Sequence, residues 1–249
     1  MDEKTKNSIL KAKNFKDIIK QKDSAPLTDL SKYADCLEAT LSAYTDFSSL
    51  CSKILPEGSN VLPGNDIILC GKIGLAGTIF LLDYFTSGLL KTLSPSYIKE
   101  SESLRDSSAI YPDVALLKEL GVSGIFPVCE RGLFKSIYEL GKSSGLGFRI
   151  DYSKVPISQY TIEFCEIFDI DPWGLLSGGC VLITANKGLA TVSKLNDAGF
   201  DAAAIGYITK DKAKLITYRD NEGGINRPQP DELLKILKKA LCNCDLSGL

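Results

Sequence analysis

From about residue 60 onward, short apolar runs alternate with stretches whose apolar residues recur at helical spacing. The runs that indicate buried strands are 66–71, 122–128, 147–152, 180–184, 202–209 and 214–218. The stretches that indicate helices are 75–90, 133–140, 160–168, 189–197 and 232–241, and one more helix is bracketed by Pro112 and Gly121. This alternation predicts one mixed α/β unit, because each strand needs a helix or another strand to cover its apolar faces.

Three local patterns add detail. Residues 3–56 have apolar residues at helical spacing and predict two or three short helices, followed by a turn-rich linker over 56–65. We therefore expect an N-terminal helical arm over 1–58 and a domain over 59–249. The strands at 202–209 and 214–218 predict a hairpin that turns at 210–212, and Asp231 is expected to cap the last helix. The lysine-rich face near the N-terminus fits a solvated surface, with a membrane-surface or partner-binding helix as the alternative.

Composition narrows the class of protein. With 249 residues, of which 44% are hydrophobic, the chain can bury a full core, and its net charge of −2 gives no basis for nucleic-acid binding. No stretch reaches the ~20 apolar residues that span a bilayer, so no membrane partner is expected. The eight cysteines stand mostly in apolar runs, which favours buried free thiols and a cytoplasmic location.

The chain contains no histidine. This excludes Ser-His-Asp and Cys-His catalysis and histidine metal sites. Cys129, beside Glu130 and Arg131 at a helix start, could be a nucleophile with a lowered pKa, but no histidine base accompanies it. Cys242 and Cys244 supply too few ligands for a metal site. We therefore assign no catalytic and no metal-binding residues.

Two glycine-containing turns are the candidate ligand sites. A glycine-rich turn before a helix binds phosphate because bare backbone N–H groups and the positive helix end can approach the anion. The candidate ligand-binding residues are Cys129, Glu130, Arg131 and Gly132 in the first turn and Ser177, Gly178 and Gly179 in the second. The Arg131 side chain obstructs the approach to the backbone, although its guanidinium can itself hold an anion. A plain tight turn is the simpler interpretation of 177–179.

Several motifs in the same order carry a resemblance to a known family. They are Pro63-Gly-Asn-Asp-Ile-Ile-Leu69, Lys72-Ile-Gly-Leu-Ala-Gly-Thr78, the Glu130 to Gly132 turn, Ile170-Asp-Pro-Trp-Gly-Leu-Leu-Ser-Gly-Gly-Cys-Val-Leu-Ile183 and Ala204-Ile-Gly-Tyr-Ile-Thr209. Together they resemble the C-terminal domain of the AIR synthase-like superfamily, closest to its hydrogenase-maturation, carbamoyl-dehydratase branch. The resemblance implies an α+β fold, with a three-layer α/β/α arrangement around a mixed sheet.

The resemblance does not extend to the residues that carry the family's chemistry. In the family, a separate N-terminal domain holds Mg-ATP through a Gly-Asp-Asp-Ala motif and builds the usual dimer. The residues before the matching half of this chain contain no such motif. In the loop, the family's Asp, Thr and first glycine fall on Pro127, Cys129 and Arg131. We therefore expect no cofactor, and we leave open whether the chain forms a homodimer.

Three functions remain open. The first, which we favour, is a non-catalytic or degenerate binding and regulatory module that has lost Mg-ATP chemistry and binds a small anionic molecule or a protein. The second is half of an ATP-dependent enzyme, of the hydrogenase-maturation or purine-synthesis type, completed by a partner chain or by self-association. The third is a structural role of the helical arm.

Overall fold

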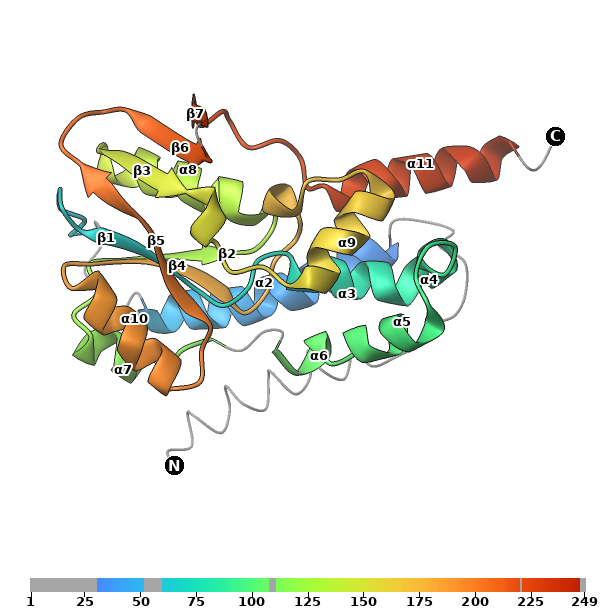
Figure 1. Ribbon diagram of the computed structural model, residues 1–249, viewed down its shortest axis with the longest axis horizontal. Coiled ribbons are helices and arrows are strands. Elements are labelled where there is room, and N and C mark those ends of the chain that lie inside the picture. The colour runs from blue at the N-terminus through green and yellow to red at the C-terminus, as the bar shows by residue number, and fades with distance from the viewer. Residues whose placement is uncertain (1–30, 52–59, 108–110, 220, 247–249) are drawn as a thin grey trace.

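A seven-stranded mixed sheet is the centre of the computed structural model, which describes residues 31–51, 60–107, 111–219 and 221–246 (Figure 1). Its strands are β1 (Asp66–Cys70), β2 (Gly124–Val128), β3 (Gly147–Asp151), β4 (Cys180–Ala185), β5 (Ala202–Thr209), β6 (Lys214–Tyr218) and β7 (Asn221–Gly224). They lie in the order β2-β4-β1-β5-β3-β6-β7, and every neighbouring pair is antiparallel except β3 and β6. The predicted α+β fold with a mixed sheet is confirmed.

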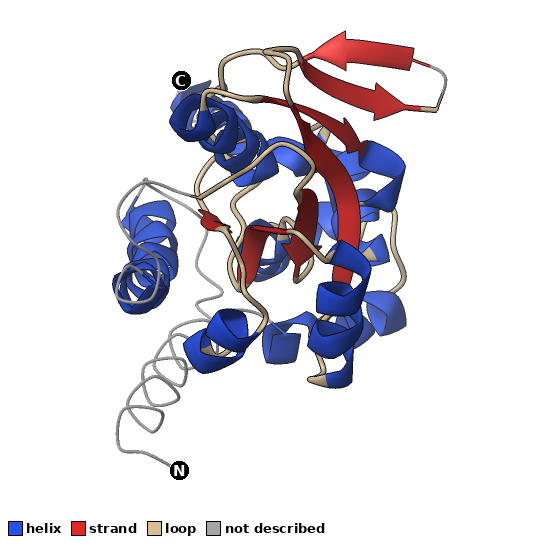
Figure 2. Cartoon of the chain, turned by 90° about the vertical axis from the view of Figure 1, so that its left-hand side faces the viewer, coloured by secondary structure: helices blue, strands red, loops and turns tan. Residues whose placement is uncertain are grey.

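Helices cover both faces of the central strands, which gives the three layers (Figure 2). In β1, Ile67 and Leu69 pack on the face that α8 (Gly132–Ser144) covers. Ile68 and Cys70 pack on the opposite face, against α2 (Ser31–Cys51), α7 (Val114–Glu119) and α10 (Gly188–Asp197). Successive side chains of a strand point to opposite faces, so a strand covered on both sides reads as a continuous apolar run. The apolar runs at 66–71 and 180–184 have this cause.

Within the segment 3–56, for which the sequence predicts two or three short helices, the structure describes one 21-residue helix, α2. It is packed into the core: the Phe47 ring stacks on Tyr111 at 4.5 Å, and the Tyr33 ring meets Phe80 edge-on. The parts of the predicted helical segment at 3–30 and 52–56, and the first residues of the predicted linker, 56–59, lie outside the described residues.

The remaining helices follow the predicted pattern, except that one predicted helix is divided in two and two short helices are present that the sequence does not predict. They are α3 (Leu75–Tyr84), α4 (Thr86–Leu89), α5 (Pro95–Ser101), α6 (Leu104–Ser107), α9 (Gln159–Phe168) and α11 (Leu233–Leu246), with short 3-10 turns η1 (Tyr152–Lys154) and η2 (Pro172–Gly174). The helix predicted over 75–90 is interrupted at Phe85, which has a non-helical backbone. The helices α5 and α6 were not predicted.

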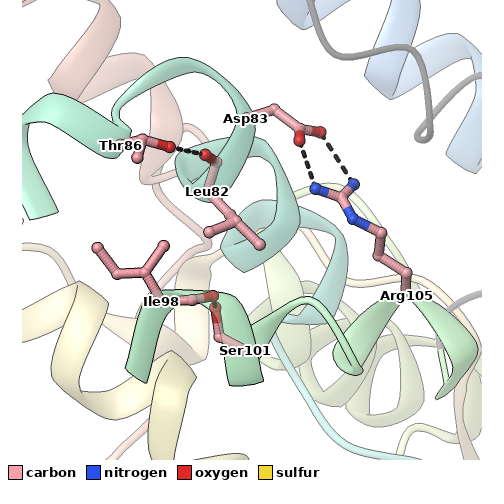
Figure 3. Close-up of polar contacts among 6 residues, drawn as sticks. All are labelled: Leu82, Asp83, Thr86, Ile98, Ser101 and Arg105. Atoms are coloured by element: carbon pink, nitrogen blue, oxygen red, sulfur yellow. Dashed lines mark hydrogen bonds and ion pairs between the residues drawn. The ribbon is translucent and has the colours of Figure 1, made fainter. Parts of the chain in front are cut away.

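An ion pair joins α6 to α3 (Figure 3). Two guanidinium nitrogens of Arg105 lie 3.2 and 2.5 Å from the two carboxylate oxygens of Asp83, and both side chains are at most 10% exposed. In the same view, the Ser101 hydroxyl donates to the carbonyl of Ile98 at 2.7 Å within α5. A bidentate pair shielded from water positions both partners more strictly than an exposed one, so it orients this short helix against α3.

The predicted hairpin between β5 and β6 is wrong. The strand β3 lies between them, antiparallel to β5 and parallel to β6. The turn at 210–213 is hydrogen-bonded to the start of β3, because Gly147 and Phe148 donate their N–H groups to the carbonyls of Asp211 and Ala213. The hairpin in this region joins β6 to β7, an exposed strand that the sequence did not indicate.

Candidate functional site

The loop between β2 and α8 has an unusual backbone. Arg131 adopts a left-handed conformation with φ 62°, and Gly132 follows with φ 57°. A Cβ on Gly132 would lie 2.3 Å from the carbonyl oxygen of Trp173 and 2.8 Å from that of Leu175. Gly132 is therefore required by a close approach of the 173–175 backbone. Arg131 occupies a conformation that glycine adopts more readily.

The two turns predicted from the sequence meet in the structure. The carbonyl of Cys129 accepts a hydrogen bond from the N–H of Ser177 at 3.0 Å and another from the N–H of Gly132 at 3.1 Å. The segment before β4 is thus joined through the backbone to the segment before α8.

The second turn uses its polar groups internally. Ser177 is completely buried, and its hydroxyl accepts from the N–H of Gly74 at 2.8 Å and donates to the carbonyl of Leu175 at 3.1 Å. Gly178 is buried, and the carbonyl oxygen of Gly179 lies against Gly71, whose added Cβ would be 2.5 Å away. Ligand binding by residues 177–179 stays a prediction, and the contacts seen there are structural.

The backbone N–H of Arg131, in the first turn, donates a hydrogen bond to Asp231, which the sequence predicts only as a helix cap. An oxygen of the Asp231 carboxylate accepts from the N–H of Arg131 at 2.8 Å, and the other accepts from the N–H of Leu233 at 3.1 Å. The backbone of Leu176 also hydrogen-bonds this carboxylate. The predicted cap at Asp231 is confirmed, and the same carboxylate also binds the backbone of the loop at Arg131.

Burial dominates the electrostatics of Asp231. The residue is 1% exposed, and burial raises the pKa of its carboxyl to about 6, against the lowering effect of the three backbone hydrogen bonds. Glu130 adds to the increase through charge repulsion. Glu130 itself lies 3.5 Å from the Nε of Arg131 and 3.4 Å from the Nζ of Lys135.

A cleft of about 610 Å³ opens beside this loop. Its walls come from the start of α8, η1, η2, the β6–β7 hairpin, the segment 225–230 and the start of α11; in Figure 1 this segment runs from β7 back to α11. The lining residues are Arg131, Phe134, Tyr152, Asp171, Gly174, Ile216, Tyr218, Asn221, Glu222, Gly223, Gly224, Ile225, Asn226, Arg227, Pro228, Gln229, Pro230, Glu232 and Lys235. Of the seven predicted ligand residues, only Arg131 lines it.

One wall of the cleft carries two acidic residues that are already hydrogen-bonded. Glu232, 5% exposed, accepts from the N–H of Asp171 at 3.1 Å and forms a 2.7 Å ion pair with Lys235. Asp171 accepts from the N–H of Trp173 at 2.9 Å. Burial raises the pKa of Asp171, and repulsion from Glu232 raises it further.

Cys129 does not have the environment of a nucleophile. It is 6% exposed, and burial raises the pKa of its thiol to about 12, whereas a reactive cysteine needs a lowered pKa. The free thiols are those of Cys36, Cys51, Cys70, Cys129, Cys165 and Cys180. Among the side chains that the structure describes, no three Cys, Asp or Glu residues are grouped to hold a metal ion. None of the described helices combines the length and apolarity needed to cross a membrane.

Curated relatives cover much of the chain at low identity. A carbamoyl dehydratase HypE of Cupriavidus necator is 25% identical over 179 residues, which is 69% of this chain and 48% of the relative. A putative hydrogenase expression/formation protein of Methanocaldococcus jannaschii is 23% identical over 210 residues, which is 82% of this chain and 60% of that protein. The chain therefore spans about half the length of the curated relatives it matches.

Solved structures share the fold. The hydrogenase maturation protein HypE of E. coli aligns with a TM-score of 0.57 at 19% identity, covering 72% of this chain and 54% of that one. A HypE-HypF complex aligns with a TM-score of 0.53 at 21% identity, covering 68% of this chain and 55% of that one. Residues 63–218 match the family described as AIR synthase related protein, C-terminal domain. The matched segment holds β1 to β6, the β2–α8 loop and the turn before β4, and the chain belongs to the AIR synthase related family through this domain.

Proposed function

We propose that this chain is a binding or regulatory module in which the phosphate-facing loop of the family has lost its Mg-ATP chemistry. The observation that supports the proposal is the contact between the Asp231 carboxylate and the N–H of Arg131. A loop binds phosphate by presenting unoccupied N–H groups to the anion. Here that N–H already donates to the chain's own carboxylate.

Electrostatic repulsion also opposes phosphate binding at this loop. A phosphate group that approached the N–H of Arg131 would meet the carboxylates of Asp231 and Glu130, and like charges at short range repel. Arg131 also places a side chain where the aligned family motif has a glycine. Phosphate binding at the loop backbone would therefore require Asp231 to move away, which would break its hydrogen bond to the N–H of Leu233 at the start of α11.

The same family membership supports a second candidate. Two of the relatives are named carbamoyl dehydratases, one solved neighbour is a HypE-HypF complex, and another is a HypE in complex with ATP. Because this chain spans about half of those relatives, it could supply one half of an ATP-dependent enzyme, with a partner chain or a second copy supplying the other. In that case a protein partner, rather than a small anion, completes the site.

Isothermal titration of the full chain with Mg-ATP separates the two candidates. The binding-module proposal predicts no saturable heat at micromolar ATP with magnesium, and the same result with ATP and a chelator. Micromolar, magnesium-dependent binding by the chain alone would overturn it. The enzyme-half candidate predicts that such binding appears only when a partner chain is added or when the chain dimerises.

Two further expectations belong to this proposal. The free thiols of the described cysteines fit a reducing compartment, so we place the protein in the cytoplasm. We also propose that residues 1–58 form an arm that completes the core of the domain over 59–249, since α2 packs against that core through Tyr33 and Phe47.

A further inference from the structure

The cleft beside the β2–α8 loop has an aromatic and aliphatic floor. Phe134, Tyr152 and Ile216 are each partly buried, and Tyr218 is 49% exposed at its edge. One face of the Tyr152 ring stacks on Trp173 at 4.1 Å with an interplanar angle of 9°, and Phe134 lies at 6.1 Å from Tyr152 in a tilted arrangement. Stacking holds Tyr152 in place, so a planar apolar group can enter against a floor that is already ordered.

The acidic residues of the cleft are already partnered. Glu232 pairs with Lys235 at 2.7 Å, Glu222 pairs with Arg149 at 2.8 Å, and Asp171 accepts from the N–H of Trp173. Because these carboxylates already have partners within the chain, they do not favour a cationic ligand in the cleft.

Two arginines are left to receive an anion. The side chain of Arg131 is 44% exposed, and its ion-pair contact is the 3.5 Å approach of its Nε to Glu130, which also pairs with Lys135. Arg227 is exposed, and no acidic side chain in the described part of the chain forms an ion pair with it. The backbone of Arg131 is held by Asp231, so the side chain that faces a ligand starts from a fixed position.

We infer that this cleft binds a small organic anion, with its aromatic or apolar body on the Phe134, Tyr152 and Ile216 floor and its charged group at Arg131 and Arg227. A volume of about 610 Å³ falls in the range of small-molecule pockets. Guanidinium groups recognise carboxylate, sulfonate and phosphate oxygens in the same bidentate manner. The inference rests on the proposed binding function, and it places the ligand outside the occupied loop backbone.

A pair of matched probes tests the charge requirement on the unmodified chain. Naphthalene sulfonate and the neutral naphthalene sulfonamide have the same body, and inorganic phosphate has the charge without the body. We expect the sulfonate to bind at least about tenfold more tightly than the sulfonamide, the difference that one charge-assisted hydrogen bond produces. Amide shifts in NMR spectra are expected at Phe134, Ile216 and Tyr218, and phosphate is expected to bind more weakly than the sulfonate.

Variants with matched controls locate the site. Arg131→Gln and Arg227→Gln should each weaken the sulfonate by about tenfold and leave the sulfonamide unchanged. Lys142→Gln removes the same charge at the exposed far end of α8 and should change neither. Tyr218→Ala should weaken both probes alike, whereas Tyr207→Ala, 47% exposed on β5 outside the cleft, should not.

The inference is overturned if the two probes bind equally well to the unmodified chain, or if Lys142→Gln weakens the sulfonate as much as the arginine variants. Shifts confined to the shallow hollow at residues 196–202, which Asn196 and Phe200 line, would also overturn it. These results are separate from the Mg-ATP titration. If the sulfonate shows no preference over the sulfonamide and Mg-ATP does not bind either, only the proposed cleft ligand is overturned. Magnesium-dependent binding of ATP by the chain alone would overturn the proposed function.

Discussion

The carboxylate of Asp231 accepts a 2.8 Å hydrogen bond from the backbone N–H of Arg131, one hundred residues earlier in the chain. This contact fills the turn that most resembles a phosphate-binding loop, and it joins the start of α8 to the start of α11. A carboxylate at the N-terminus of a helix is stabilised by the helix dipole as well as by the N–H groups.

Asp231→Ala should destabilise the protein. An alanine leaves the N–H groups of Arg131 and Leu233 without their acceptor, and each buried donor without a partner costs roughly 1–3 kcal/mol. Urea denaturation followed by circular dichroism measures the change. Asp113→Ala is the control, because Asp113 is an exposed cap of α7 that accepts from the N–H of Ala115, and its loss should cost only about 1 kcal/mol. Equal stability losses in the two variants would contradict the prediction.

The stability of the protein should depend on pH through Asp231. Its pKa in the folded state is about 6, above the ordinary value of 3.8, so the folded state binds the proton more tightly than the unfolded state. The stabilisation is fully present below about pH 4 and is lost as the pH rises through 6, by up to roughly 3 kcal/mol. Burial raises the pKa of Asp171 with the same sign.

Unfolding free energies at pH 7 and pH 5 measure this effect. The unmodified chain should gain stability from Asp231 on going to pH 5, and Asp231→Asn should remove that part of the gain. An identical pH dependence in the variant would show that the carboxyl titrates alike in both states.

Gly132→Ala should be strongly destabilising. The added Cβ would lie 2.3 Å from the carbonyl oxygen of Trp173. Because relieving this clash requires the backbone to shift, we expect the free energy of unfolding to fall by about 3 kcal/mol or more. Gly145→Ala is the control, because Gly145 has a similar φ of 65° with nothing within 4 Å of the added atom. That variant should lose only about 1 kcal/mol, the conformational cost for alanine. Comparable losses by thermal denaturation would mean that the close approach does not matter.

Phe47→Ala should destabilise the whole domain, although Phe47 precedes the segment that matches the family. Its ring is 5% exposed and stacks on Tyr111, so its removal leaves a cavity and should cost about 3–5 kcal/mol. Leu189→Ala, on an 83% exposed residue of α10, should change stability by less than about 0.5 kcal/mol. A single cooperative unfolding transition at a lower denaturant concentration would support the assignment of α2 to the core. An unchanged midpoint would contradict that assignment.

Local patterns were sufficient to locate most elements. The positions of β1 and β4 follow within a few residues from their apolar runs, and the ends of α8 and α10 follow from the glycines after them. Hydrophobic periodicity and chain reversal depend on neighbouring residues, so the sequence alone shows them. The short helices α5 and α6 were missed because neither is long enough to show a helical period. The strand β7, with the sequence Asn-Glu-Gly-Gly, has no strand propensity and is held by pairing with β6.

The sequence by itself determined the family, the strand and helix segments, and the two turns that meet at Cys129 and Ser177. Only the tertiary structure decided that β3 inserts between β5 and β6, that Asp231 occupies the N–H of Arg131, and that a cleft opens beside that loop. The reason is physical: periodicity records which faces of a segment are buried, but the partner of a backbone N–H is chosen by residues far away in the chain. Asp231 looks like an ordinary helix cap in the sequence, and the fold alone brings its second oxygen to Arg131.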